Sequence, residues 1–366
     1  MSPVSERATV PLRARAARRP GDSIVVAWIV KHTSLAAFLL VTVVGFLTPL
    51  VVVLSSAFNH GASGLRQMFA AGTFPKLLET TVTLALGDAV FSLIAGTALA
   101  WFAYRLPRRM RWLGFLPLVP LVMPPLALVL GYIFLAAPIA GYANSFLRAI
   151  LPWEHGAISG PFNVYSLAWM IVIGSISLTA FVFLFVQSAL SQVPGEVIDG
   201  AAASGAGPVR TYWKVVLPLI RPGLVYGAFT VFLLGFGEFT IPLLLGTTNS
   251  IYVLTSALYK QLNNYPVNIA LASAYGLPVV LAGLLLIIVQ RFSLRQQERF
   301  SAGSGRGSRP LSTNGPIAQV MLGLYGFIGV LLPLFAIVVV SLEKNWSSTI
   351  SASNFTLGNY HYVLTS

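Results

Sequence analysis

The chain contains no cysteine among its 366 residues. This absence excludes disulfide bonds, thiolate metal sites and a cysteine nucleophile. Charged residues are also scarce, at 9% of the sequence, whereas soluble domains carry about 25%. Acidic residues are the fewest, since 10 Asp and Glu stand against 23 Lys and Arg. With 56% hydrophobic residues, the composition predicts a protein whose main solvent is lipid.

Several apolar stretches are long enough to cross a bilayer of about 30 Å, which needs about 20 helical residues. We predict spans at residues 33–58, 80–104, 112–136, 164–190, 223–246, 267–290 and 317–341. The apolar residues do not alternate with a period of two, and a lipid-exposed backbone must then be helical. The first run is far longer than the apolar core of a cleaved signal peptide, so we expect it to remain as the first helix.

Lysine and arginine gather in alternate loops. They are concentrated in the tail 1–32 and in the loops 105–111, 191–222 and 291–309, while the intervening loops hold one or two each. The positive-inside rule therefore predicts a cytoplasmic N terminus and a cytoplasmic loop 191–222. In this setting the net charge of +13 indicates topology rather than nucleic-acid binding. The basic tail also suits contact with anionic lipid headgroups.

Residues 296–316 form a Gly/Ser/Arg-rich linker, after which a new span begins. The sequence "PLFAIVVVSL" (333–342) resembles "PLVVVLSSAF" (49–58), which ends the first span. Apolar segments also resemble each other by chance, so a repeat and a coincidence both stay open. A repeat would divide the chain into a basic cytoplasmic tail (1–32), a complete six-helix half (33–295), the linker (296–316) and the truncated start of a second half (317–366).

The loop 194–222 is the most informative polar segment. We expect Pro194 and Gly195 to end the preceding helix. Glu196 and Asp199 then suit the positive end of a short new helix. The alanines 201–203 give that helix a bare face, which allows close approach by another backbone.

A second short helix is predicted further along the loop. Gly205 and Gly207 should break the first helix, and Pro208 suits the first turn of the next one. We expect the second helix to expose Tyr212 and Trp213. The result is a helix–turn–helix across the cytoplasmic face, suited to docking into a groove of a partner protein.

This loop resembles the EAA signature of permease subunits in binding-protein-dependent ABC importers. That signature reads Glu-Ala-Ala, three residues, Gly, nine residues and Ile-x-Leu-Pro. The matching positions are Asp199, Gly200, Ala201, Gly205, Val215, Leu217 and Pro218, at the same spacing. Asp, Gly and Val stand for Glu, Ala and Ile, which shortens the acidic side chain and loosens the short helix. The resemblance implies that these residues, with Ala202, couple the permease to an ATPase.

The resemblance also implies the fold and the partners. The fold would be an all-α membrane protein, with the six-helix transmembrane domain of an ABC importer plus the first helix of a second half. The partners would be two cytoplasmic ATPase subunits, a periplasmic or extracellular solute-binding protein and the lipid bilayer, but no nucleic acid. The location would be the bacterial plasma (inner) membrane, crossed several times.

The sequence contains no G-x-x-x-x-G-K-[ST], so ATP and Mg²⁺ are expected on the partner ATPase and no cofactor in this chain. We therefore expect a transport subunit rather than an enzyme, with no catalytic residues. The histidines are scattered near the ends of spans or in loops, so solvated side chains are expected rather than a metal site. They are His32, His60, His155 and His361.

Two acidic residues within predicted spans are candidates for the translocation pathway, because intramembrane charges are costly and often functional. They are Asp88 in the second span and Glu238 late in the fifth. A structural hydrogen bond is the alternative for each. Gly235, Gly237 and Pro242 surround Glu238 and predict an irregular helix there, of the kind that lines cavities.

The stretch "GEFTIPLLLGTTNSIYVLTSALYKQLNNYPVNIALASAYGLPVVL", which begins at Gly237, resembles iron(III)-type permeases, which often fuse two permease halves. Iron(III) is therefore the expected solute, with polyamines, 2-aminoethylphosphonate, thiamine and sulfate as alternatives. The rival classes are a gradient-driven secondary transporter, which needs ion sites within its spans, and a membrane-embedded enzyme, for which the sequence shows no catalytic constellation.

Overall fold

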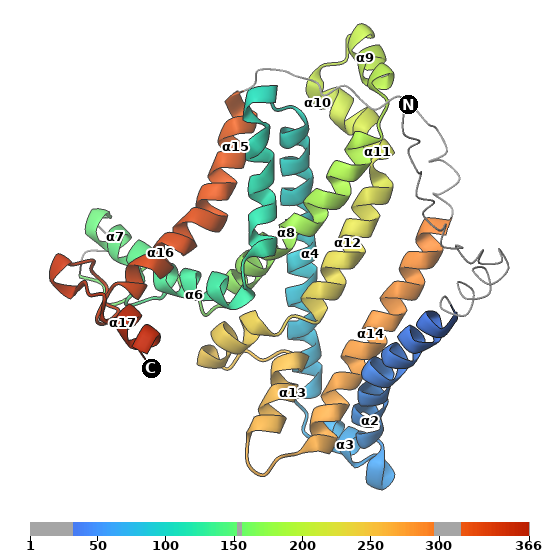
Figure 1. The fold of residues 1–366 in the computed structure, drawn as a ribbon, viewed down its shortest axis with the longest axis vertical. Helices are drawn as coiled ribbons and strands as arrows, with labels where there is room; N and C mark the ends of the chain where they lie inside the picture. Colours follow the sequence, from blue (N-terminus) through green and yellow to red (C-terminus); the bar gives the residue numbers. More distant parts are fainter. Residues whose placement is uncertain (1–31, 152–155, 296–315, 366) are drawn as a thin grey trace, which may run out of the picture. The chain divides into compact units, whose positions relative to one another are not determined.

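The computed structural model describes residues 32–151, 156–295 and 316–365. Regular structure in these ranges is helical, apart from one isolated β-bridge between Glu343 and Phe355. The predicted all-α class is therefore confirmed (Figure 1). The chain divides into two compact units, residues 1–56 and 57–366, which are described separately.

The first unit is described from His32 onward as a single helix, His32–Ser56. A π-helical turn, η1 (Val43–Leu47), interrupts it and is followed by α2 (Thr48–Ser56). No residue of η1 or α2 is buried. The predicted first span, 33–58, is confirmed to within two residues at its end.

The second unit contains the remaining helices. Its α-helices are α3 (Asn59–Ala70), α4 (Phe74–Tyr104), α5 (Val119–Val122), α6 (Pro125–Ala136), α7 (Tyr142–Ile150), α8 (Leu167–Ser191), α9 (Gly195–Ala203), α10 (Pro208–Thr211), α11 (Leu217–Leu219), α12 (Arg221–Phe236), α13 (Leu254–Asn263), α14 (Ile269–Arg295), α15 (Pro316–Gly326), α16 (Leu332–Ser341) and α17 (Gly358–Thr365). Its other helical turns are η2 (Arg108–Leu118), η4 (Tyr212–Val216), η5 (Pro242–Gly246), η6 (Thr247–Asn249), η8 (Phe327–Leu331) and η9 (Ala352–Asn354).

Within the described residues, 5 helices are long and apolar enough to cross a membrane, or up to 7 if two bent pairs each count as one span. The straight ones are His32–Ser56, Phe74–Tyr104, Leu167–Ser191, Ile269–Phe292 and Pro316–Ser341. The bent pairs are Arg108–Val122 with Pro125–Ala136 and Val209–Leu219 with Arg221–Phe236. All seven predicted spans fall on these segments, but two of them are not continuous helices.

The predicted span 112–136 bends by 99° between its two parts. Met123 and Pro124 have extended backbones at the break, with ψ of 135° and 129°. Each of them precedes a proline, and the proline ring excludes the preceding residue from the α-helical region. The sequence Met-Pro-Pro therefore forces the break.

The predicted span 223–246 is wrong beyond Phe236, where α12 ends. This helix has 16 residues and is about 24 Å long, which is shorter than the apolar thickness of a bilayer. Gly237 ends it, and the chain continues as an irregular stretch into the π turn η5 and the short η6. The irregular backbone expected around Glu238 is confirmed.

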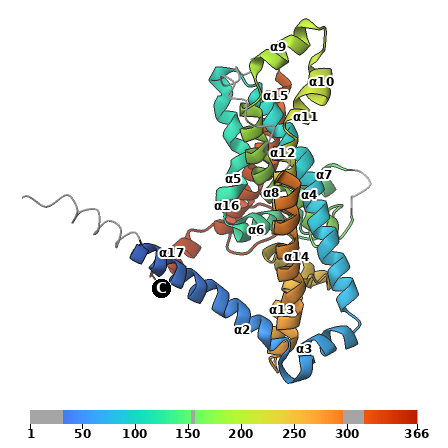
Figure 2. The ribbon, with the colours of Figure 1, turned by 90° about the vertical axis from the view of Figure 1, so that its right-hand side faces the viewer.

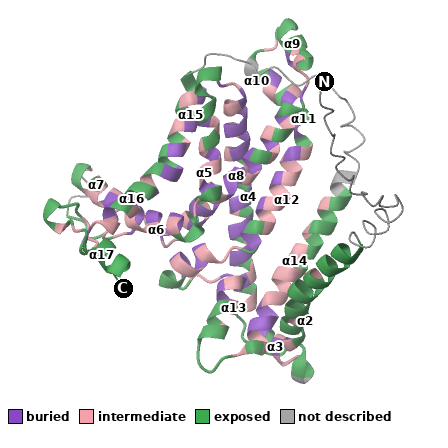
Figure 3. Ribbon diagram, in the orientation of Figure 1, coloured by how far each residue is buried: buried purple, intermediate pink, exposed green. Residues whose placement is uncertain are grey.

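Helices α4, α8 and α12 pack against one another and hold much of the buried surface of the second unit (Figure 3). Glycines stand at their contacts. A Cβ added to Gly96 would lie 2.7 Å from Val182 Cβ, and one added to Gly223 would lie 2.9 Å from the carbonyl oxygen of Phe185. Small residues allow helix backbones to approach closely in lipid, where packing replaces the hydrophobic force.

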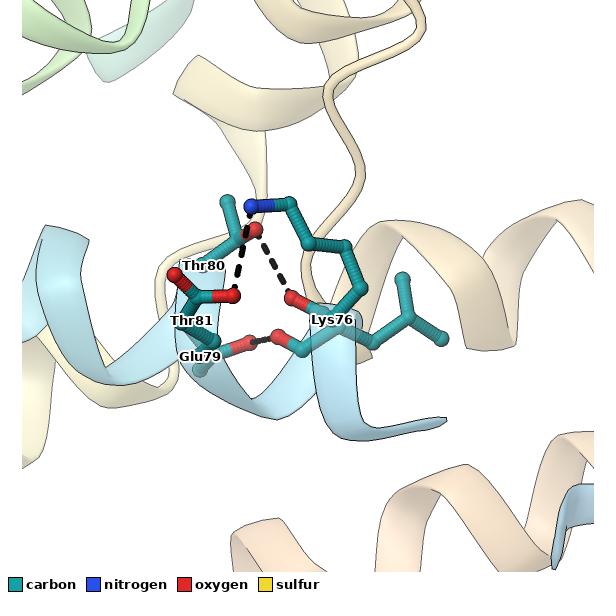
Figure 4. A network of polar contacts seen from close by, with 5 residues as sticks. Lys76, Glu79, Thr80 and Thr81 are labelled. Carbon is teal, nitrogen blue, oxygen red and sulfur yellow. Dashed lines mark hydrogen bonds and ion pairs between the residues drawn. The ribbon is translucent and has the colours of Figure 1, made fainter. Parts of the chain in front are cut away.

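Helix α4 is bonded to the first residue of α13 through Thr81, and Figure 4 shows the polar contacts that Thr81, Lys76 and Glu79 make within α4. Thr81 Oγ1 donates to the carbonyl of Leu77 (2.7 Å) and accepts from the backbone N–H of Leu254 (3.0 Å). Lys76 and Glu79 form an exposed ion pair of 3.2 Å on the same turn. Figures 1 and 2 show α3 and α13 at one end of the second unit and α9 and α10 at the other.

The last described segment packs against earlier helices of the second unit. Helix α15 contacts α4 and η2, and α16 contacts α6. Tyrosine hydroxyls donate across this contact: Tyr132 to the carbonyl of Ile328 (3.0 Å), Tyr325 to the carbonyl of Ile176 (2.9 Å) and Tyr142 to Glu343 Oε2 (2.8 Å). Burial, and then the bond to Glu343, raise the pKa of Tyr142, so its hydroxyl remains a donor at neutral pH.

We expect Tyr132→Phe to weaken the attachment of α15 and α16, because the carbonyl of Ile328 loses its donor. Hydrogen bonds between membrane helices contribute about 0.6 kcal/mol on average, so the loss should be about that size. The measurement is the free energy of unfolding in detergent. Tyr362→Phe is the control, since Tyr362 is 72% exposed, and an equal effect in both variants would contradict the assignment.

Candidate functional site

The loop between α8 and α12 forms the helix–turn–helix that its sequence predicts. Helix α9 ends at Ala203, Gly205 has a positive φ of 79°, and Pro208 begins α10. A left-handed φ is easily adopted by glycine and strained in most other residues. The chain then runs through η4 and α11 to Ile220, where it turns by 71° into α12.

Two details of the prediction for the first short helix are wrong. Gly195 does not end the preceding helix, because α8 ends at Ser191 and Gly195 is the first residue of α9, with Pro194 as its N-cap. Glu196 lies in the first turn of α9, as expected, but Asp199 lies beyond that turn. Only Glu196 is therefore close to the positive end of the helix dipole.

The inner face of the loop is attached to the core of the second unit. Ile198 is 3% exposed, and Val216 and Ile220 are fully buried in the same cluster. Tyr212 packs on Trp101 of α4, with ring centroids 4.9 Å apart. The prediction that Tyr212 is exposed is therefore wrong, since Tyr212 is half-buried and packs against the core cluster.

The outer face of the loop is exposed and combines small, apolar and charged residues. Asp199, Gly200, Ala202 and Gly205 are exposed, and Ala201 is half-buried. A Cβ at Gly200 or Gly205 would meet no other atom within 4 Å. We call this face, together with the large apolar side chains beside it, the docking face. Those side chains are Val197 (42% exposed), Val209 (70%) and Trp213 (61%).

The later positions of the matched signature have a different environment. Val215 and Leu217 are half-buried, and Leu217 packs against the core cluster, while Pro218 is exposed. The structure therefore divides the predicted site residues into an exposed set on α9 and the turn, and a set at η4 and α11 that attaches them to the core.

The docking face lies at the same end of the second unit as the basic loop 105–111. Trp101, which contacts Tyr212, also lies under the guanidinium of Arg105, at 5.5 Å from the ring centre. Arg210, Lys214 and Arg221 of the loop itself are exposed. Two of the loops predicted to be cytoplasmic therefore lie together.

Glu238 lies just outside α12 and caps the next helical stretch. Its Oε1 accepts from the backbone N–H of Ile241 (3.2 Å), and its carbonyl accepts from Thr255 Oγ1 (2.6 Å). The side chain is half-buried. Glu238 thus holds the break after α12 in place, and the rest of its carboxyl group remains accessible for another role.

Asp88 is fully buried where α4, α8 and α12 meet. Neither carboxyl oxygen has a hydrogen-bond partner among the described residues. Glycines face it from both neighbouring helices: a Cβ at Gly174 would lie 2.5 Å from Oδ1, and one at Gly235 would lie 3.2 Å from Oδ2. Asp88 therefore occupies the centre of the helix contact in this conformation.

The structure does not bring Glu238 close to the docking face. The docking loop precedes the N-terminal end of α12, whereas Glu238 follows its C-terminal end. Sequence reasoning missed Trp101 and Ile198, which attach the loop, and Gly174, which makes room for Asp88. Val197 and Ile198 are the large apolar residues of the otherwise small and polar helix α9, and that pattern could have indicated a contact with the core.

No three His, Asp or Glu side chains lie together in the part of the chain that the structure describes. His361 is exposed, and His155 lies outside the described residues. The absence of a metal site remains a prediction.

Comparison with known proteins gives one family. Residues 92–299 match the model of the binding-protein-dependent transport system inner membrane component family. The chain is 26% identical over 272 residues to the spermidine/putrescine transport system permease protein PotB of Salmonella typhimurium (strain SL1344), an alignment that covers 69% of this chain and 92% of that protein.

A second relative is the putative ferric transport system permease protein FbpB 1 of Haemophilus influenzae. It is 26% identical over 242 residues, which cover 65% of this chain but 37% of that protein. Among solved structures, a bacterial ABC transporter involved in the import of the acidic polysaccharide alginate aligns with a TM-score of 0.61. That alignment covers 77% of this chain and 99% of that one at 17% identity, so the likeness concerns the fold.

We expect Gly174→Ala to lower the free energy of unfolding by about 1–3 kcal/mol, as overpacking does, because the added methyl group collides with Asp88. The double variant Asp88→Ala/Gly174→Ala should recover much of the loss. Gly323→Ala is the control, since a Cβ there meets nothing within 4 Å. Thermal unfolding in detergent measures all three, and the same loss with and without Asp88→Ala would contradict the contact.

Proposed function

The chain belongs to the family of inner membrane components of binding-protein-dependent transport systems, and on that premise we propose that it couples ATP hydrolysis on a partner ATPase to the import of a solute, iron(III) in the first place. It is an ABC-type permease, a transport subunit with several membrane helices. The observation that supports the coupling role is the docking face. Its outer side chains are exposed, and the inner side chains of the same loop are buried in the core of the second unit.

The docking face has the features of a protein contact. Bare glycines and alanines allow close approach, and Trp213 supplies an exposed aromatic side chain of the kind that dominates binding energy in protein interfaces, while Val209 adds exposed apolar area. Exposed basic residues surround it, beside the acidic Glu196 and Asp199. Two cytoplasmic ATPase subunits, which would hold the ATP and Mg²⁺, are the proposed partners.

Movement of the docked loop would be passed to the spans through its buried side chains. Ile198 and Val216 belong to the cluster that includes residues of α4 and α8, and α12 begins directly after Ile220. A partner that moves α9 would therefore move these helices as a rigid body, which is one of the established forms of switching. A solute-binding protein on the opposite side of the membrane would deliver the solute.

The proposed orientation places the N terminus and the docking face in the cytoplasm of a bacterial cell, with α3 and α13 on the outer side. The supporting observation is that Arg105, at the start of the basic loop 105–111, and Tyr212 of the docking loop both lie against Trp101 of α4, since positive residues remain on the cytoplasmic side.

Iron(III) is supported by the likeness to the ferric permease and by the region that starts at Gly237. Polyamine is the second candidate, and the specific observation that favours it is the alignment with PotB, which covers most of both chains. Glu238 is the proposed pathway residue, because its half-buried carboxylate at a helix break would attract either cation. Asp88 would join the pathway only in a conformation that separates α8 from α12.

We expect Gly205→Val to abolish binding of the ATPase while membrane insertion is retained. A β-branched residue at a φ of 79° strains the turn, although its side chain meets no neighbouring atom. The measurement is the amount of ATPase that copurifies with the tagged permease. Membrane insertion is followed in the same preparation by the yield of detergent-extracted permease.

Two matched variants serve as controls for this prediction. Gly207→Val adds the same side chain at a position that is equally open but has no positive φ, so it should retain more of the ATPase. Gly205→Asn should restore binding, because Asn tolerates the left-handed conformation. Normal copurification of Gly205→Val would contradict the coupling role.

The solute is tested by ATP hydrolysis in the reconstituted transporter. Binding proteins loaded with Fe(III) or with spermidine are added in turn, and the empty proteins are the controls. We expect the Fe(III)-loaded protein to stimulate hydrolysis. Stimulation by the spermidine-loaded protein alone would replace iron with polyamine, and an ionophore-sensitive uptake that needs no ATPase would support a secondary transporter instead.

A further inference from the structure

The 3₁₀ helix η2 begins the bent span that joins Arg108–Val122 to Pro125–Ala136. It has 11 residues, whereas most 3₁₀ helices stop after about three or four, because their hydrogen bonds have poorer geometry. Such a helix has about three residues per turn, so side chains three positions apart lie directly above one another. In an α-helix they would be turned by about 60°. The side chains of η2 therefore stand in straight rows.

One row is largely buried and holds η2 in place. Leu113 belongs to the core cluster that also includes Val216 of the docking loop. Leu116 packs on Gly326 of α15, where a Cβ would lie 2.7 Å from the leucine Cδ1. These contacts fix the rotation of η2 about its own axis and so determine which side chains face outward.

A second row is exposed along its whole length. It consists of Arg109, Trp112 (61% exposed) and Phe115 (68% exposed). Because η2 begins a span, each residue of this row lies deeper in the membrane than the one before it. With a rise of about 2 Å per residue, the row descends about 12 Å, which exceeds the headgroup layer of about 5–7 Å in each leaflet.

The order of the side chains in this row follows the polarity of a membrane surface. A positive charge comes first, at the depth of the headgroups. Tryptophan follows, and it is the residue enriched at the boundary between headgroups and hydrocarbon. Phe115 comes last, at the depth of the acyl chains. The row therefore matches a phospholipid molecule along its length.

The charges beside this row are all positive. Arg108 and Arg111 are exposed on the adjoining row, and the chain has no acidic residue between Asp88 and Glu154. In the ranges that the structure describes, no ion pair neutralises these two arginines or Arg109. Three guanidinium groups within about one turn thus face outward, and guanidinium binds phosphate oxygens with two parallel hydrogen bonds.

We propose that the exposed row of η2 and the arginines beside it bind an anionic phospholipid of the cytoplasmic leaflet. The arginines select it over a zwitterionic lipid, because basic residues at a membrane surface attract its net negative charge. A topology signal alone requires arginines on the cytoplasmic side. It does not require Arg109 to stand in line with Trp112 and Phe115, which is what the long 3₁₀ helix achieves.

The inference rests on the cytoplasmic orientation proposed above, and it uses a surface that the docking face does not include. The partner ATPase is the other neighbour to consider at this end of the molecule. A soluble subunit would reach Arg109 but not Phe115, since Phe115 lies within an apolar span. The depth of the row therefore favours a lipid over the ATPase.

The test is photo-cross-linking of the full-length transporter with its ATPase, in nanodiscs that contain equal amounts of phosphatidylglycerol and phosphatidylcholine. Benzoylphenylalanine replaces Trp112, and mass spectrometry identifies the lipids and peptides attached to it. Arg109→Gln removes one charge from the site, and Arg109→Lys retains the charge. Arg291→Gln is the matched control, because it removes an exposed arginine near the end of α14, on the side that is also predicted to be cytoplasmic.

We expect phosphatidylglycerol adducts to exceed phosphatidylcholine adducts several-fold. Arg109→Gln should lower this ratio, while Arg109→Lys should keep most of it and Arg291→Gln should leave it unchanged. Adducts in equal proportion, adducts to the ATPase or to permease peptides, no adducts, or an equal effect of Arg291→Gln would each overturn the inference. The amount of ATPase retained in the discs reports the coupling role separately, so the two proposals can fail independently.

Discussion

The close contact of α4, α8 and α12 is the constraint on which the rest of this structure depends. No hydrophobic force brings helices together in lipid, so their association requires backbones that approach closely. Gly96, Gly174 and Gly223 provide this room, and the side chains that fill it are Val182, Asp88 and Ala189. Because α8 and α12 flank the docking loop, the same contact fixes both ends of the surface proposed to meet the ATPase.

The docking loop is attached to these helices and therefore cannot move by itself. Ile198, Tyr212 and Val216 connect it to a cluster that also includes Trp101 of α4 and Leu322 of α15. A displacement of α9 would reach the core without any flexible segment between them. The bends at Met123 and Ile220 mark where one rigid piece ends and the next begins, which is the arrangement that rigid-body switching needs.

The sequence predicted the helices and the helix–turn–helix because their signals are local. Gly205 adopts the left-handed turn that follows α9, and Pro208 begins α10. The bend at Met123–Pro124 could also have been predicted from the adjacent prolines. The length of the apolar stretch alone indicated one continuous helix instead. The contact of Gly174 with Asp88 could not be predicted, since it joins residues far apart in the chain. For the same reason, the contact between Tyr212 and Trp101 could be found only in the structure.

Prolines also explain where three of the π turns occur. The π turns η1, η4 and η8 are each followed, at the second residue, by a proline: Pro49, Pro218 and Pro333. Each proline leaves one carbonyl without its donor, and Tyr132 satisfies the one at Ile328. In the docking loop the corresponding carbonyl belongs to Trp213, whose side chain is exposed. Pro218 of the matched signature thus belongs to a π turn in which Val216 is buried and Trp213 is exposed, so water or a partner can reach this turn and donate to a carbonyl that the proline leaves without its donor.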